Sequence, residues 1–305
     1  MLSSEEVIRR FESLRQAPRA GGGRAPHKPL LALYLLGRIQ QSARAAGTPM
    51  VVPYASAEPV VSALITEFGP PGRDAHRAAL PFFHLDRSVW MPEGDGLAPR
   101  HAVLRDRRAV GRFVPEVEDA LRRAPALVVA IARRLLSANF PDSYAAPICE
   151  AVGLDVAAAP DEPADAPKRV RASEFRPRVL RAYDYACAFC GYDGMLCGES
   201  TLLSPVALAA AHVQWHALAG PDEVSNGLAL CDLHHTLFDR GLLGIDVARR
   251  IVVSPAFSGR SEAAQRIVRD LNQRPLREPT TPGERVEEQF FGWHREQVFR
   301  AGTAA

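Results

Sequence analysis

The stretch Cys187-Ala188-Phe189-Cys190, together with Cys231-Asp232-Leu233-His234 further along the chain, decides the fold of the second half of this protein. Structural zinc takes four Cys or His ligands in a tetrahedron, and ligand pairs with this spacing hold the ion from two crossings of the chain. Metal binding of this kind stabilises a small motif that has too few apolar residues to fold rigidly alone. The sequence therefore predicts structural Zn²⁺ at Cys187, Cys190, Cys231 and His234.

Three further polar residues lie close to these two pairs in the sequence. His212 follows Ala210-Ala211, Asn226 precedes Gly227-Leu228, and His235 comes directly after the second pair. A purely structural zinc site has no need of such residues. We interpret His212, Asn226 and His235 as a catalytic set that hydrolyses phosphodiester bonds.

The motif that joins these residues is that of a known nuclease family. The run Cys187-x-x-Cys190, Ala211-His212-Val213 and Asn226-Gly227-Leu228-x-Leu230-Cys231-x-x-His234-His235-x-x-Phe238-Asp239 resembles an HNH (ββα-metal) endonuclease of McrA-like restriction enzymes, over residues 172–260. The resemblance implies a β-hairpin and a helix around one catalytic divalent cation, Mg²⁺, Mn²⁺ or another. It also implies that His212 is the general base, that Asn226 orients it and that His235 binds the metal.

One position departs from the family pattern. Many members have Asp directly before the base as a second metal ligand, and this chain has Ala211 there. Asp239 lies four residues after His235, and residues with this spacing share a helix face. Asp239 is therefore the candidate for the missing metal ligand.

The length of 305 residues allows two domains, and 47% apolar with 24% charged residues is typical of a globular protein. Residues 155–168 are rich in Ala, Pro and acidic residues, so we predict a linker between an N-terminal domain at 1–154 and a C-terminal domain at 169–305. No apolar run reaches the roughly 20 residues that span a bilayer. The N-terminus does not resemble a signal peptide, so we expect a cytoplasmic protein.

The predicted fold class is α+β, with a mostly helical N-terminal domain that contains a small β-hairpin. Helices are expected after the capping box Ser3-x-x-Glu6, from Pro29, from Ser56 to Phe68, and over 115–123 and 125–138. The hairpin is expected from 81–85 and 89–91. In the C-terminal domain we expect a helix from Ser173 to Ala186, a strand from Val206 to Val213, a helix from Asn226 to Phe238, a hairpin of 242–245 with 250–253, and a tail helix over 282–299.

Two motifs in the N-terminal half carry a second resemblance. Pro26-His27-Lys28-Pro29-Leu30-Leu31 and Leu80-Pro81-Phe82-Phe83-His84-Leu85 resemble the sulfur-binding domain that precedes HNH modules in type IV restriction enzymes. That family recognises DNA in which sulfur replaces one non-bridging phosphate oxygen. The resemblance implies that Leu80, Pro81 and Phe82 form an apolar cup for the sulfur and that His27 and Lys28 contact phosphates.

Polar residues beside this motif add candidate base contacts. Arg73, His76 and Arg77 precede the cup closely enough to reach base edges. An alternative is that residues 80–85 form an ordinary core strand. Of the 37 basic residues, all except Lys28 and Lys168 are arginine. This bias fits a phosphate-binding surface and equally a GC-rich genome.

These expectations combine into a modification-dependent (type IV) restriction endonuclease that acts on double-stranded, phosphorothioate-modified DNA. Two alternatives stay open: a zinc-held DNA-binding protein with an inactive HNH site, and an HNH nuclease that reads another mark such as methylcytosine. One HNH module cuts one strand, so we predict a homodimer. Its interface is expected at the second helix or at the apolar tail residues Val286, Phe290, Phe291, Trp293, Val298 and Phe299.

Overall fold

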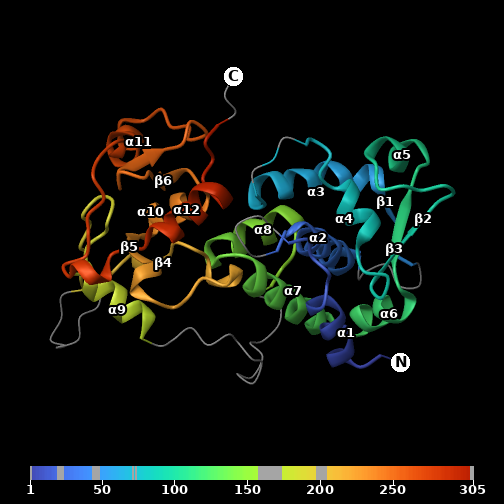
Figure 1. Cartoon of the computed structure of the whole chain (residues 1–305). Coiled ribbons are helices and arrows are strands. Elements are labelled where there is room, and N and C mark those ends of the chain that lie inside the picture. Colours follow the sequence, from blue (N-terminus) through green and yellow to red (C-terminus); the bar gives the residue numbers. More distant parts are fainter. Residues whose placement is uncertain are drawn as a thin grey trace. The chain divides into compact units, whose positions relative to one another are not determined.

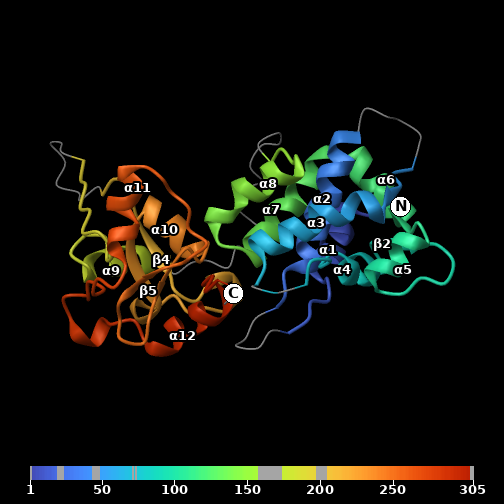
Figure 2. The ribbon, with the colours of Figure 1, turned by 90° about the horizontal axis from the view of Figure 1, so that it is seen from above.

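The structure of the chain is a computed structural model that describes residues 2–18, 24–42, 49–70, 72, 74–156, 174–196 and 205–302. It divides into two compact units, Met1–Ala166 and Pro167–Ala305, each with helices and small sheets, so the fold class is α+β (Figures 1 and 2). Most of the predicted linker, Arg73 and Cys197 lie outside the described residues. Within them, no helix is long and apolar enough to cross a membrane.

The first unit is built around a buried central helix. Its helices are α1 (Ser4–Glu12), α2 (His27–Ser42), α3 (Tyr54–Phe68), α4 (Ala79–His84), α5 (His101–Asp106), α6 (Pro115–Arg123), α7 (Pro125–Asn139) and α8 (Ala145–Val152), with the 3-10 turn η1 (Asp142–Tyr144). Helix α2 is buried from Pro29 to Gly37 and lies among α3, α7 and α8 (Figure 2). The prediction of a central buried helix is confirmed, although α2 begins two residues before Pro29.

Local signals placed several helix ends of this unit correctly. The Ser3 side chain accepts a hydrogen bond from the Glu6 backbone N–H at 3.2 Å, as an N-cap residue should. Helices α6 and α7 begin at Pro115 and Pro125, where the missing N–H costs no helical hydrogen bond. Helix α3 ends at Phe68, as predicted, with Gly69 as its C-cap, although it begins at Tyr54 rather than Ser56.

The small sheet of the first unit differs from the predicted hairpin. Strands β1 (Val52–Pro53), β2 (Trp90–Glu93) and β3 (Val110–Phe113) pair antiparallel in the order β1-β3-β2. The prediction of a strand over 81–85 is wrong, because this segment lies in α4. Phe82 and Leu85, three residues apart, are both buried, and the Trp90 indole N–H donates to the Phe82 carbonyl at 3.1 Å. Helical spacing, not alternation, buries this apolar run.

The second unit contains a β-hairpin and a helix next to the two ligand pairs. Its elements are α9 (Phe175–Ala182), β4 (Leu208–His212), η2 (His216–Leu218), η3 (Val224–Asn226), β5 (Gly227–Cys231), α10 (Asp232–Asp239), β6 (Leu243–Ile245), β7 (Ile251–Val253), α11 (Glu262–Ile267), η4 (Arg269–Leu271), η5 (Pro282–Glu284) and α12 (Glu288–Gln297). Strands β4 and β5 pair antiparallel with His212 opposite Gly227, and α10 follows directly. Helix α9 contacts both strands.

Three predicted elements of this unit need correction and one is confirmed. The helix predicted to reach Ala186 is shorter, because α9 ends at Ala182. The predicted helix over Asn226–Phe238 is wrong in its first half, because residues 227–231 form β5 and α10 begins at Asp232. The closing hairpin is confirmed as β6 and β7. The tail helix is shorter than predicted, beginning at Glu288 after the separate turn η5.

The apolar tail is covered by its own unit. Val286, Phe290, Phe291, Trp293 and Val298 are at most 6% exposed, and Phe291 belongs to the core of the second unit. Helix α2 is similarly enclosed within the first unit. Both segments that the sequence suggested as a dimer interface are therefore buried inside a single chain.

Candidate metal and catalytic site

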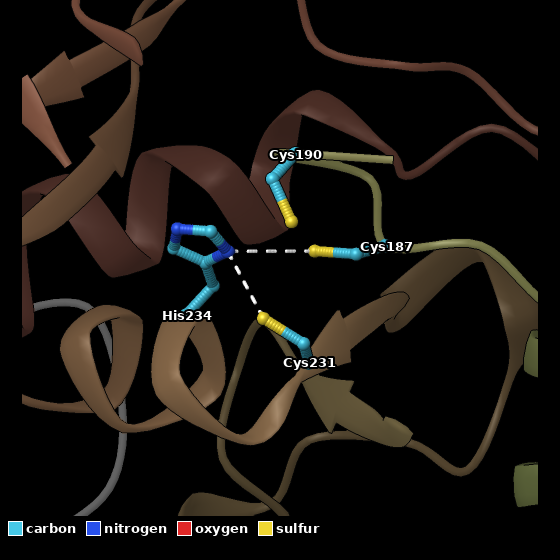
Figure 3. Close-up of side chains that lie close together, drawn as sticks. All are labelled: Cys187, Cys190, Cys231 and His234. Carbon is cyan, nitrogen blue, oxygen red and sulfur yellow. Dashed lines mark hydrogen bonds between the residues drawn. The ribbon is translucent and has the colours of Figure 1, made fainter. Parts of the chain in front are cut away.

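The two cysteine pairs converge on one point of the second unit. Cys187 and Cys190 lie in the turn after α9, Cys231 ends β5, and His234 is on the first turn of α10 (Figure 3). One ligand atom from each lies within 4.8 Å of the others. Nδ1 of His234 is 3.1 Å from Sγ of Cys231 and 3.6 Å from Sγ of Cys187. The predicted four ligands thus form a single cluster.

The protonation of this cluster favours metal binding. Hydrogen bonds from Cys190 and then Cys231 lower the pKa of the Cys187 thiol, and the same contact with Cys187 raises the pKa of Cys190. Burial alone would lower the pKa of His234, but its hydrogen bonds to Cys187 and Cys231 outweigh burial and raise it to about 10. The site therefore stabilises the Cys187 thiolate next to the protonated His234 ring. A metal cation can bind in such a site by replacing the protons.

The donor geometry fits zinc. Zn–S and Zn–N bonds of about 2.3 and 2.0 Å in a tetrahedron place sulfur and nitrogen about 3.5 Å apart. The observed separations of 3.1 and 3.6 Å lie on either side of that value. Nε2 of His234 is 3.0 Å from the carbonyl oxygen of Ile267, the kind of contact that orients a metal-binding imidazole.

His212 lies at the end of β4 in a largely enclosed setting. Its ring stacks on Phe175 of α9 with centroids 4.0 Å apart, and its Nε2 is 2.7 Å from Oδ1 of Asp222. The other carboxylate oxygen of Asp222 is 3.7 Å from Nε2 of His216. Asp222 could not be identified from the sequence, because a carboxylate in the turn Gly220-Pro221-Asp222 carries no signal of a distant partner.

The Asn226 side chain holds the loop that carries Asp222. The side chain is fully buried; its Oδ1 accepts from the Gln214 N–H at 2.8 Å, and its Nδ2 donates to the carbonyls of Gln214 and Pro221 at 3.0 Å each. A Cβ on Gly220 would lie 1.8 Å from the Gln214 carbonyl oxygen and 2.9 Å from Nδ2 of Asn226. Glycine is required where the loop closes this tightly on Asn226.

His235 and Asp239 form a second pair on α10. Nε2 of His235 is 3.3 Å from Oδ2 of Asp239, and the Asp239 side chain is almost completely buried. Ala211, where the family often has a metal-binding Asp, is buried in the core and offers no ligand. No third ligand from the described residues joins this pair in a compact metal-binding group. Two protein ligands suit Mg²⁺, which keeps several water molecules when bound.

The candidate phosphate-binding residues of the first unit lie at the start of α2. His27 and Lys28 are half-buried in its first turn, and burial lowers the pKa of Lys28. Arg77 reaches His27 with an Nη2–Nε2 distance of 3.4 Å. The same guanidinium donates to the carbonyls of Ile65 and Pro70, so Arg77 links the end of α3 to the start of α2.

The candidate cup residues differ in their exposure. Leu80 is 57% exposed at the start of α4, whereas Pro81 is buried and Phe82 is completely buried against Tyr54 and Trp90. Phe82 therefore packs α4 against the core of the first unit. Leu80 is the candidate cup residue that is exposed to solvent. His76, in the turn before α4, stacks on His101 instead of standing alone.

Comparisons with known proteins agree with the two-unit arrangement. The family model of the ScoMcrA-like DNA sulfur-binding domain matches residues 4–157, and an HNH endonuclease model matches residues 187–246. A comparison with curated proteins found no match.

Several solved structures are similar to about half of the chain. The sulfur-binding domain of SprMcrA complexed with phosphorothioated DNA is 24% identical, over 50% of this chain and 95% of that one, with a TM-score of 0.41. The corresponding domain of ScoMcrA, also complexed with phosphorothioated DNA, is 23% identical over 48% and 94%, with a TM-score of 0.40. The modification-dependent TagI restriction endonuclease is 22% identical over 51% and 45%, with a TM-score of 0.31.

The two family matches cover consecutive parts of one chain, with the sulfur-binding model first and the nuclease model second. The sulfur-binding match alone spans half of the sequence. The nuclease match includes all four residues of the Cys₃His cluster, His212, Asp222, Asn226, His235 and Asp239. The chain therefore belongs to the family of the ScoMcrA-like DNA sulfur-binding domain, and its second unit makes it an HNH DNA endonuclease.

Proposed function

We propose that this chain is a type IV restriction endonuclease that binds double-stranded DNA with a phosphorothioate and hydrolyses phosphodiester bonds near that mark. The observation that carries the proposal is the match of a sulfur-binding family and an HNH nuclease family to consecutive parts of one chain. A binding domain that selects a modified backbone gives a nuclease of low sequence preference a way to choose its target.

Recognition of sulfur is assigned to the exposed start of α4. Sulfur is larger and less strongly hydrated than oxygen, so the exposed apolar side chain of Leu80, with Pro81 buried next to it, desolvates sulfur at low cost and disfavours a phosphate oxygen. Replacement of one phosphate oxygen by sulfur changes the free energy of DNA binding by roughly 1–3 kcal/mol, by analogy with other small differences within a binding pocket. His27 and Lys28, at the start of α2, would bind neighbouring phosphates, and Phe82 would support the surface from the core.

Further contacts are needed because one atom gives limited discrimination. Arg77 and His76 lie between α3 and α4, and Arg73 precedes them in the sequence. We assign base-edge or phosphate contacts to this segment, with Arg77 acting mainly by positioning His27, given its hydrogen bonds to Ile65 and Pro70. Arginine suits phosphate because its planar group binds two oxygens at once.

Hydrolysis is assigned to His212 as the general base. Asp222, 2.7 Å from Nε2 of His212, stabilises the positive charge that the ring gains when it accepts a proton from the attacking water. Phe175 fixes the ring plane by stacking. Asn226 acts through the backbone: it ties Gln214 to Pro221 and so keeps Asp222 beside His212.

The proposed metals have separate roles. Cys187, Cys190, Cys231 and His234 would hold structural Zn²⁺, consistent with their sulfur–nitrogen separations. His235 and Asp239 would hold the catalytic Mg²⁺, Mn²⁺ or similar cation, whose chemistry is to neutralise charge on the phosphate and the leaving oxygen. The Asp239 carboxylate suits Mg²⁺ or Mn²⁺, whereas the His235 imidazole favours a transition metal ion.

Matched duplexes test this function directly. One set differs only in a single phosphorothioate, and another carries methylcytosine at the same place. We expect tighter binding and Mg²⁺- or Mn²⁺-dependent cleavage of the phosphorothioate duplex, with cleavage absent in His212→Ala. Equal binding to all duplexes would reject sulfur recognition, and preference for methylcytosine would identify that mark instead. Selective binding without cleavage by the wild type would indicate an inactive HNH site.

A further inference from the structure

Three side chains from separate segments of the first unit meet at a place that hydrolysis does not use, although one of them, His76, lies in the segment assigned to DNA contacts. Glu58 lies on α3, His76 lies in the turn before α4, and His101 is the first residue of α5. One ligand atom from each lies within 4.8 Å of the others. Among the described residues, this is one of two groups of at least three His, Cys, Asp or Glu side chains that lie close enough to hold a metal ion, and the other is the Cys₃His cluster.

The contacts of Glu58 and His76 hold this turn against α3. Nδ1 of His76 is 2.9 Å from Oε1 of Glu58, and the same oxygen accepts from the Ser62 hydroxyl at 3.2 Å. Ser62 in turn accepts from the Ala78 backbone N–H at 3.1 Å, and the His76 N–H donates to Asp74 at 2.8 Å. The carboxylate and imidazole are thus held together by a network that includes the backbone on both sides of His76.

A buried tyrosine in the core of the first unit fixes the orientation of the His101 ring. Its Nδ1 is 3.1 Å from the hydroxyl of Tyr54, a fully buried residue that packs edge-on against Phe82. With Nδ1 paired to Tyr54, Nε2 is the nitrogen that His101 can present to an ion. This arrangement is common in metal sites, where the second ring nitrogen of a ligand histidine contacts an oxygen that fixes its orientation.

The two imidazoles lie face to face. Their centroids are 3.5 Å apart and their planes differ by 9°. Neutral imidazole is the form that binds metal, and a carboxylate beside two such rings provides a charged third ligand. Glu58 is 16% exposed and His76 is 49% exposed, which leaves a path from solvent to the site.

We propose that Glu58, His76 and His101 form a binding site for a divalent transition metal ion of the zinc class. Two imidazoles and one carboxylate suit Zn²⁺ and its neighbours rather than Mg²⁺ or Ca²⁺, which prefer oxygen ligands. Because the nitrogen lone pairs lie in the ring planes, one of the two stacked imidazoles must tilt out of the stack for both to bind the same ion. A bound ion replaces the proton shared by His76 and Glu58, while Tyr54 accepts a hydrogen bond from Nδ1 of His101.

Such an ion would fasten three elements together. Glu58 is on α3, His101 begins α5, and His76 is four residues before Leu80 on α4. The ion would thereby fix the start of α4 against the rest of the first unit. Metal uptake itself does not depend on what the first unit recognises, so the site and the proposed DNA mark are tested separately.

Zinc uptake by the full-length protein tests the site. The wild type, the double variant His76→Ala/His101→Ala and the control His84→Ala are dialysed against graded Zn²⁺, and bound zinc is counted by elemental analysis. His84 is exposed on α4, outside the cluster. We expect the double variant to bind one ion fewer per chain than the wild type and His84→Ala to match the wild type. All three proteins keep the Cys₃His cluster and the His235–Asp239 pair, so only the difference between them counts.

Two more conservative variants control for the possibility that the double variant loses zinc because it does not fold. Glu58→Gln removes the charged ligand with little change of shape, and Tyr54→Phe keeps the buried ring while removing the hydroxyl. We expect Glu58→Gln to lose the same ion and Tyr54→Phe to bind it about 10- to 100-fold more weakly, the usual effect of losing such a supporting contact. Equal zinc uptake by the wild type, Glu58→Gln and the double variant would overturn the proposal.

Discussion

At the scale of the residue, the contact between His212 and Asp222 determines how the proposed base works. We expect His212→Ala to lower the cleavage rate at least about 10²-fold, the usual contribution of a general base, with DNA binding unchanged. Asp222→Asn keeps the shape but removes the charge that stabilises protonated His212, so we expect about a 10- to 100-fold loss. Single-turnover cleavage and a binding titration measure the two effects.

The matched control for Asp222→Asn is Glu262→Gln, which neutralises an exposed carboxylate on α11. It should cleave like the wild type. Cleavage by Asp222→Asn at the wild-type rate would show that the carboxylate has no part in the reaction.

His294 gives a second prediction at this scale. Burial lowers its pKa from 6.5 to about 4, and its ring stacks on Phe238 and donates to the Phe238 carbonyl at 2.9 Å. Between these pH values the unfolded chain binds the proton and the folded chain does not. The free energy of unfolding should therefore fall as pH decreases from about 6.5 to about 4, by about 1.4 kcal/mol per pH unit from this ring.

Urea unfolding of the second unit at pH 7 and 5 measures the effect. His294→Gln keeps a donor for the Phe238 carbonyl but cannot take up a proton in this range, so its stability should depend less on pH. The Cys₃His cluster responds to acid equally in both proteins. Identical pH dependence of the wild type and His294→Gln would contradict the assignment.

Residues differ in how far the sequence alone could identify them. The Cys₃His cluster was predictable, because two ligand pairs with fixed spacing form a pattern that chance rarely produces. Asp222 was not, because its contact with His212 depends on a loop that Asn226 and Gly220 close by tertiary contacts. The sequence could also not predict that Glu58, His76 and His101 lie close together, because 43 positions separate Glu58 from His101.

At the scale of the element, short apolar runs were the main source of error. Residues 81–85 and 227–231 are each about five residues long, and periodicity cannot distinguish helix from strand over that length. The first run became α4 because it buries Phe82 and Leu85 on one face, and the second became β5 because it pairs with β4. Elements with their own end signals, such as α1, α6 and α7, were predicted correctly.

The cysteine pairs give a prediction about how the second unit is held together. Cys187 comes after α9, whereas Cys231 and His234 join β5 to α10, so a shared ion fixes these segments to one another. We expect Cys187→Ala, or removal of zinc by a chelator, to abolish the cooperative melting of the second unit and to leave that of the first. Calorimetry measures both transitions.

Cys149→Ala provides the control, since Cys149 is a buried cysteine on α8 in the first unit. It should leave the melting of the second unit unchanged. Normal melting of that unit in Cys187→Ala would remove the zinc assignment.

The packing of α9 against β5 gives a further prediction. A Cβ on Gly227 would lie 2.5 Å from Cγ2 of Val179 and 3.2 Å from the ring of Phe175. We expect Gly227→Ala to displace α9, to destabilise the second unit by about 1–3 kcal/mol and to slow cleavage, because Phe175 stacks on His212. Gly283→Ala, where an added Cβ meets no atom within 4 Å, is the control. If Gly227→Ala unfolds with the same free energy as the wild type, α9 can move away from β5 without destabilising the second unit, and the prediction is wrong.

At the scale of the whole molecule, the number of cutting sites determines the product. The chain has one set of His212, Asn226 and His235, and one such site cuts one strand. A double-strand break therefore requires two cuts, and a symmetric pair of chains is the simplest way to place two sites on opposite strands. The apolar tail and α2 are buried within their own units, so any interface must use other surfaces.

We predict a homodimer on DNA that converts phosphorothioate-containing plasmid to linear product. Analytical ultracentrifugation with and without a phosphorothioate duplex measures the assembly, against a chain mass of 33.2 kDa. Mixing active protein with excess His212→Ala should then raise the share of nicked plasmid, because mixed dimers retain one working site. If sedimentation gives only the monomer mass and the mixture leaves the ratio of nicked to linear product unchanged, each chain cuts independently and the dimer is wrong.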